Sequence, residues 1–143
     1  MSDTTINELS VPPHVQGLMQ AERHMLYARH TVEGTLGRFG VTWCGYLLLS
    51  AAARRDNMSY RDLCAQAGLS SSTVPILVNA MCQEDLLTCV AESSRQGGRV
   101  LVTLTGQGHQ RIEAIHQTVE PVAEPLLSTL VDLLHPEDPS SVR

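Results

Sequence analysis

The chain has 143 residues, with 10 Lys and Arg against 15 Asp and Glu and a net charge of −5; this length allows one ordinary domain and excludes two. The longest uncharged run, Phe39 to Ala53, is too short and too rich in Gly, Ser and Thr for a membrane span. The segment Met1 to Ser10 lacks the basic and apolar regions of a secretory signal, so we expect a single cytoplasmic domain.

The charge is distributed unevenly along the chain. Residues 1–37 carry a net charge of −2, residues 38–111 carry +2 from seven Arg against five acids, and residues 112–143 carry −5. Only the middle is basic, and the distribution of charge matters more than its total for binding to phosphate. All ten basic residues are Arg, which suits bidentate contacts with phosphate or guanine, although a GC-rich genome is the weightier explanation.

Two helices are predicted in the first part of the chain. Apolar residues between Val15 and Leu36 recur at intervals of three, four and seven, which predicts a long amphipathic helix entered through Pro12-Pro13 and ended by Gly37. A second helix is predicted over 43–55, with Thr42 as its N-cap.

A helix-turn-helix and a hairpin are predicted next. Ser59, followed three residues later by Asp62, resembles a capping box and begins a short helix that ends at Gly68. Pro75 fits only a first helical turn, so the following helix should begin at about Ser71 or Ser72. Residues 86–92 and 99–105 are rich in β-branched side chains and flank a turn-forming stretch, which predicts a two-stranded hairpin.

The last predicted helix carries an apolar stripe from Ile112 to Leu133, and Pro121 and Pro125 should kink or split it. The two long helices at the ends of the chain have nowhere to bury their apolar faces within one subunit, which predicts a homodimer. Residues 135–143 are expected to form a loose tail.

The order of these elements resembles the MarR (multiple antibiotic resistance regulator) family of winged-helix transcription regulators over residues 12–134. The similar motifs are Val41-Thr42, residues 60–64, the turn 68–74, and Leu104-Thr105-Gly106-Gln107-Gly108, which is similar to the family's L-T-x-x-G and is the most specific of the set.

The resemblance implies a mainly α fold with a small β-wing: a single domain with a winged helix-turn-helix over 41–105 and dimerisation helices over 12–37 and 106–134. It implies a homodimeric regulator, of repressor type, that binds a pseudo-palindromic operator in double-stranded DNA.

The sequence departs from the family pattern where DNA contacts are expected. Ile76 stands in place of an Arg in the recognition helix, Asp85 replaces a Gly before the wing, and Gln96 and Gly98 replace the wing's D-x-R pair. Residues 70–85 contain no Arg or Lys, so the recognition helix offers bases only hydroxyl groups and one asparagine amide. The candidate DNA-binding residues are Arg95 and Arg99 in the wing, Ser71, Ser72 and Thr73 in the turn, Asn79 in the helix, and Arg54, Arg55 and Arg61 around the helix-turn-helix.

Each of these candidates also has a plain structural interpretation. The arginines either contact phosphates or are ordinary surface charges, and the turn hydroxyls are N-caps first and base readers second.

The family typically binds small aromatic effectors in a cleft beside the dimer helices. The residues expected to line it, unless they are only core, are Met25, Tyr27, His30, Trp43 and Tyr46.

The cysteines and histidines invite two further hypotheses. Cys44, Cys64, Cys82 and Cys89 contain no C-x-x-C pair and are interpreted as reduced, structural thiols, with Cys44 the choice for a redox sensor if one exists. His109, Glu113 and His116 share a helical face that suits a metal, but such a face is more often a hydrated surface. We therefore expect no metal and no cofactor.

Two functions remain in competition. One is the DNA-binding regulator; the other is a degenerate winged-helix module that has lost specific DNA binding and acts through protein contacts. An enzyme is not expected, because the sequence shows no nucleophile–base pairing and no phosphate-binding loop. Arginines gathered on one face with the recognition helix would favour the regulator.

Overall fold

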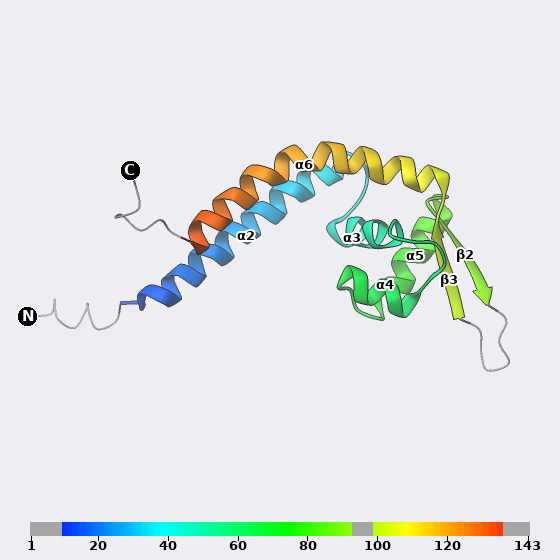
Figure 1. The fold of residues 1–143 in the computed structure, drawn as a ribbon, viewed down its shortest axis with the longest axis horizontal. Coiled ribbons are helices and arrows are strands. Elements are labelled where there is room, and N and C mark those ends of the chain that lie inside the picture. Colours follow the sequence, from blue (N-terminus) through cyan, green and yellow to red (C-terminus); the bar gives the residue numbers. More distant parts are fainter. Residues whose placement is uncertain (1–9, 93–98, 136–143) are drawn as a thin grey trace, which may run out of the picture. The chain divides into compact units, whose positions relative to one another are not determined.

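The computed structural model describes residues 10–92 and 99–135 and divides into two compact units. The central unit is Glu33–Glu120, and the terminal unit combines the described residues before Glu33 with those after Glu120. Figure 1 shows the elements. In chain order they are α2 (Pro13–Gly37), α3 (Trp43–Ala52), β1 (Met58–Ser59), α4 (Tyr60–Ala67), α5 (Thr73–Gln83), β2 (Leu87–Glu92), β3 (Arg99–Leu104) and α6 (Gly106–Leu134).

The helix ends of the central unit follow the predicted capping chemistry. The Thr42 hydroxyl accepts a hydrogen bond from the Gly45 amide (3.0 Å) at the start of α3, and the Ser59 hydroxyl accepts one from the Asp62 amide (3.1 Å) at the start of α4. Gly68 ends α4 in the left-handed conformation (φ 69°) that glycine adopts without steric cost. The predicted helix-turn-helix, α4 followed by α5, is confirmed.

The predicted hairpin is confirmed and is joined by a strand that the sequence did not indicate. Strand β3 pairs antiparallel with β2 from Leu87↔Leu104 to Glu92↔Arg99, and on its other side with β1, giving the order β1-β3-β2. With two residues, β1 is too short to show an alternating pattern.

The core of the central unit lies where α3, α4 and α5 meet the sheet. Its largest fully buried side chains include Leu48, Leu49, Met58, Leu63, Val74, Val78, Leu86, Leu87 and Val102. The buried apolar side chains of α4 and α5 thus build a core that α3 and the sheet complete.

The prediction was that Pro121 and Pro125 would kink or split the last helix. The split is wrong, because α6 is continuous from Gly106 to Leu134. Each proline deprives the carbonyl four residues earlier of a donor. The residues that lose a partner, Gln117 and Pro121, are exposed, so water can hydrogen-bond to their carbonyl groups. The helix therefore tolerates both prolines.

In the terminal unit, the first part of α2 runs beside the last part of α6 in the antiparallel sense (Figure 1). His24 Nε2 lies 2.8 Å from the Leu126 carbonyl oxygen, which joins the two segments. Among the described residues, no helix has the length and apolar character needed to cross a membrane.

Candidate nucleic-acid interface

Helix α5 buries one face and presents the opposite one to solvent. Val74, Val78 and Met81 are buried, whereas Ile76, Asn79 and Gln83 are exposed on the other side, and 70% of the Ile76 surface is accessible. The exposed face therefore offers amide groups and an apolar side chain, and it carries no Lys or Arg. Sequence reasoning noted Ile76 only as a departure from the family; its exposure follows from the helical spacing of the buried residues.

The turn before α5 is organised by Ser70, which the sequence analysis did not single out. The Ser70 hydroxyl lies 2.7 Å from the Thr73 hydroxyl and 3.1 Å from that of Ser72, and it accepts a hydrogen bond from the Thr73 amide (3.2 Å). Ser72, at the N-cap position, makes no capping bond through its side chain. Ser72 and Thr73 are thus hydrogen-bonded to Ser70, and both Ser71 and Ser72 are exposed. Helix α5 begins at Thr73, just after the predicted start.

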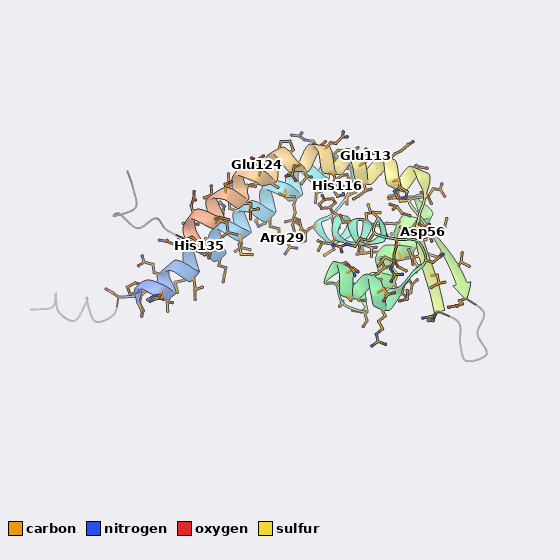
Figure 2. All side chains as sticks on the ribbon, in the orientation of Figure 1. Arg29, Asp56, Glu113, His116, Glu124 and His135 are labelled. Atoms are coloured by element: carbon orange, nitrogen blue, oxygen red, sulfur yellow. The ribbon has the colours of Figure 1, made fainter. Side chains whose placement is uncertain are left out.

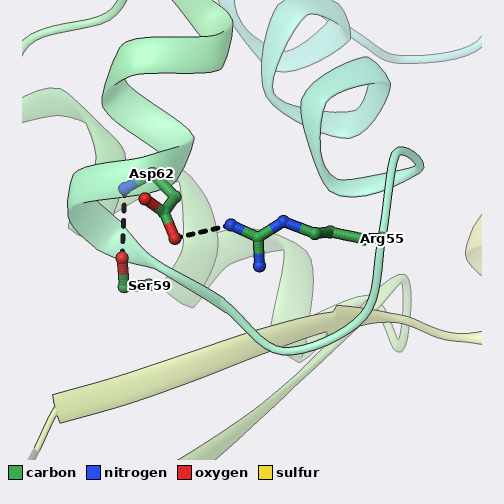
Figure 3. A network of polar contacts seen from close by, with 3 residues as sticks. All are labelled: Arg55, Ser59 and Asp62. Atoms are coloured by element: carbon green, nitrogen blue, oxygen red, sulfur yellow. Dashed lines mark hydrogen bonds and ion pairs between the residues drawn. The ribbon is translucent and has the colours of Figure 1, made fainter.

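Two of the predicted arginines are paired with carboxylates. Arg55 lies 2.7 Å from Asp62 in the first turn of α4, where Ser59 caps the same residue (Figure 3). The hydrogen bond from Arg55 is the main reason that the pKa of Asp62 is lowered, with Ser59 adding to it. Arg99 lies 3.0 Å from Glu92, its directly opposite residue on β2. Exposed pairs of this kind contribute about 0–1 kcal/mol, so phosphate oxygens can replace the carboxylates at little cost.

The remaining arginines of the basic middle segment are used differently. Arg111 of α6 donates to the Phe39 carbonyl (3.2 Å) and so holds the loop before α3. Arg54 and Arg61 are exposed, and within residues 10–92 and 99–135 neither is paired with a carboxylate. Arg95, Gln96 and Gly98 lie outside the described residues, so the predicted wing doublet is described only through Arg99.

The L-T-x-x-G motif ties the exit of the wing to the turn after α5. The Thr105 hydroxyl lies 2.6 Å from the Asp85 carbonyl oxygen and 3.1 Å from that of Leu86, and it accepts from the Gly108 amide (2.9 Å). A Cβ at Gly108 would collide with the Leu86 carbonyl, which explains why this position needs glycine. Asp85 has φ 61°, the left-handed conformation, which accounts for the glycine that the family has there.

The predicted effector residues are divided between the two units. Met25 and Tyr27 are exposed in the terminal unit, where His30 also lies. Trp43 and Tyr46 are half-buried on α3 in the central unit. The Tyr46 hydroxyl lies 2.7 Å from Nδ1 of His116, and burial is the main reason that the pKa of Tyr46 is raised. Figure 2 labels His116 on α6.

The same contact engages His116, one of the three residues considered for a metal. Within the described part of the chain, no group of three or more His, Cys, Asp and Glu residues is arranged to hold a metal ion. The four cysteines are free thiols, and Cys44, the redox candidate, is half-buried on α3. Cys82 and Cys89, by contrast, lie with their sulfur atoms 2.8 Å apart.

No protein-family model and no curated protein sequence matches the chain. Solved structures do. A MarR-family transcriptional regulator from a Rhodococcus species matches with TM-score 0.69 and 17% identity, over 90% of this chain and 99% of that one. MarR from E. coli matches with TM-score 0.66 and 16% identity, over 87% and 96%.

A third structure comes from a study of how 6-hydroxynicotinic acid regulates DNA binding by Bordetella bronchiseptica BpsR. It matches with TM-score 0.64 and 20% identity, over 89% of each chain. The fold class predicted from the sequence is thus confirmed: the chain has the winged helix-turn-helix fold of the MarR-family transcription regulators.

Proposed function

We propose that this protein is a DNA-binding transcription regulator that acts in the cytoplasm as a homodimer, of repressor type, on a pseudo-palindromic operator. The observation that carries the proposal is the reading head: α4 and α5 form a helix-turn-helix, and the paired strands β2 and β3 follow at once. Helix α5 leaves one whole face uncovered, as major-groove reading requires. In this proposal the chain forms one domain, with terminal dimerisation helices over 12–37 and 106–134.

Dimer formation is supported by the terminal unit. Its apolar side chains Leu18, Met19, Leu26, Leu127, Val131 and Leu134 are exposed in the single chain. Met25 and Tyr27 of the same unit are also exposed, and uncovered apolar side chains in such number indicate a surface that contacts a partner. A second copy of the chain offers the same surface, and a two-fold dimer covers both.

The roles of the reading head are divided between helix and wing. Asn79 can read an adenine edge, and the Ile76 side chain can contact a thymine methyl group. Helix α5 carries no cation, so we assign the attraction to phosphate to Arg95 and Arg99 in the wing, with Arg54 and Arg55 before α4 and Arg61 on it. Ser71 is the turn hydroxyl best placed for DNA, since Ser72 and Thr73 are bonded to Ser70.

A small aromatic effector is proposed to modulate this binding, in line with the action of 6-hydroxynicotinic acid on BpsR. Trp43 and Tyr46 supply the aromatic surface of α3, and Tyr46 with His116 supplies polar groups for a hydroxyl or carboxylate. A Tyr46→Phe variant should retain DNA affinity and lose part of the response to hydroxylated aromatic acids, measured by titration of the preformed DNA complex.

The alternative, a module that acts through protein contacts, is favoured by one observation. The large apolar side chain of Ile76 is 70% exposed on α5, and the helix has no basic residue. An apolar, uncharged helix face suits a protein partner as well as a base edge.

The experiment that separates them is a salt titration of DNA affinity, on duplexes selected from fragments of the genome. Replacing Arg95 and Arg99 together by alanine should cost orders of magnitude in affinity, and the slope of log affinity against log salt should fall by about one for every phosphate that the variant no longer neutralises. Arg23→Ala, in the terminal unit, is the matched control and should leave the slope unchanged. An unaltered slope in the wing variant would exclude the wing as the anchor.

A further inference from the structure

The reading head contains one pair of thiols in contact. Cys82 lies in the last turn of α5 and Cys89 in the middle of β2, and their sulfur atoms are 2.8 Å apart. No contact of this kind joins Cys44 or Cys64 to another cysteine, although all four residues belong to the described part of the chain. We propose that Cys82 and Cys89 are a modification site at which a reversible disulfide ties the recognition helix to the wing.

The position of Cys89 on the sheet explains the contact. Residues alternate between the two faces of a strand, so Cys89 shares the face of Leu87, which is buried against the core. Cys82 is half-buried and packs against the same core from α5. The two thiols therefore meet at the margin of the core, where Cys82 is half-buried and Cys89 is exposed, so a small oxidant can reach the pair.

The turn between the two cysteines is fixed by other contacts. Asp85 holds the left-handed conformation, and the Thr105 hydroxyl bonds to its carbonyl group. The Leu86 amide donates to the Met81 carbonyl at the end of α5 (2.9 Å). A disulfide needs its sulfur atoms about 2.05 Å apart, so the two sulfur atoms must approach each other by less than about 1 Å.

The oxidant is proposed to be a hydroperoxide. The pKa of Cys89 is raised to about 12, first by burial and then by its neighbour Cys82, so Cys89 keeps its proton at neutral pH. We therefore assign the first attack to Cys82, whose thiolate breaks the O–O bond and becomes a sulfenic acid while the peroxide is reduced to an alcohol or water. The Cys89 sulfur then displaces the sulfenic oxygen, which leaves as water with the Cys89 proton. Two thiols and one hydroperoxide thus give one disulfide, one alcohol and one water.

The expected effect is to stabilise the head and leave its shape unchanged. The bond joins atoms already in contact, and it restricts the unfolded chain between α5 and β2. We expect oxidation to change DNA affinity by less than about threefold, and only this expectation rests on the proposed function. Peroxide treatment that leaves DNA binding intact also agrees with the structural role expected for the cysteines.

The test uses the full chain with Cys44 and Cys64 replaced by serine, so that only the pair remains. After treatment with hydrogen peroxide in the native state, both thiols should resist alkylation and the mass should fall by two hydrogen atoms, and dithiothreitol should reverse both changes. The melting temperature should rise by roughly 5 °C or more on oxidation.

Two further variants serve as controls. Cys89→Ser in the same background should show neither the mass loss nor the rise in melting temperature, and Cys82→Ala repeats the test in case the serine variant folds poorly. A mass gain of one or two oxygen atoms in the parent, or disulfide-linked dimers, would overturn the proposal. None of these measurements involves DNA, so they stand even if the proposed function fails.

Discussion

The central and terminal units differ in how far they bury their large apolar side chains. In the central unit, Leu48, Leu63 and Val78 are fully buried by neighbours from the same chain. In the terminal unit, Leu18 is 68% exposed and Leu127 is 61% exposed. The core of the central unit is closed within one chain, although Ile76 stays exposed on α5, whereas the terminal unit presents an apolar surface that needs a cover. One chain is enough to bury the core of the central unit. We propose that two chains are needed to bury the apolar surface of the terminal unit.

The largest expected effect concerns the terminal unit. Replacing Leu18 and Leu127 together by glutamate should convert dimers to monomers, weakening self-association by about 100-fold or more, because carboxylates buried at an interface lose their hydration without gaining a partner. Sedimentation over a range of concentrations measures the effect. The matched control, methionine at both positions, keeps the surface apolar and should remain dimeric. If the wild-type protein itself is monomeric, the proposed dimer is wrong.

The central unit should be most sensitive at Gly108. Alanine there must displace the Leu86 carbonyl or the Leu104 side chain, and should lower the free energy of unfolding by about 1–3 kcal/mol. Gly106→Ala, two residues earlier on the same helix, is the control, because an added Cβ there meets nothing within 4 Å. Chemical denaturation should therefore separate the two variants; equal losses would mean that the close approach at Gly108 contributes nothing.

A smaller effect of opposite sign is expected at Asp85. Its left-handed conformation costs a residue with a Cβ more than it costs glycine, so Asp85→Gly should raise the free energy of unfolding by about 0.5–1 kcal/mol. Glu84→Gly is the control, because the neighbouring residue Glu84 has φ −91° and is not strained. This variant should lower the free energy of unfolding, since glycine adds freedom to the unfolded chain. If both variants are destabilised alike, strain at Asp85 is not relieved by glycine.

The smallest effect is the pH dependence at Asp62. Because its pKa is lowered in the folded state, chiefly by the hydrogen bond from Arg55, its contribution to stability is present above the unfolded pKa of about 3.9 and is lost as the pH falls through the folded value. Arg55→Ala should move the Asp62 pKa upward in an NMR titration. Arg54→Ala, which removes the adjacent charge, should leave it nearly in place; an equal rise would assign the shift to general charge rather than to the hydrogen bond.

The sequence predicted best what depends on neighbours along the chain. Thr42, Ser59 and Gly68 act as caps because capping is local chemistry, and the spacing of Val74, Val78 and Met81 identifies the buried face of α5. The same spacing places Ile76 on the open face, so that feature was within reach of sequence reasoning.

Features that depend on tertiary packing were missed. Strand β1 exists only because β3 offers a free edge, and the contact between Cys82 and Cys89 depends on the turn at Asp85. The Ser70 hydroxyl bonds to the hydroxyl groups of Ser72 and Thr73. Residue spacing alone could not show this, because Ser72 is an equally suitable N-cap in the sequence. The pairing of Arg55 and Arg99 with carboxylates likewise required the structure.

We propose that the exposed face of α5 reads a specific DNA sequence. The most direct test compares the affinity of the wild-type protein for a selected pseudo-palindromic duplex with its affinity for a scrambled duplex of equal length, at one physiological salt concentration. We predict a preference of about 1,000-fold or more for the selected duplex, with two chains bound per duplex. Equal affinity for the two duplexes would contradict the claim and leave the protein-contact module as the better explanation.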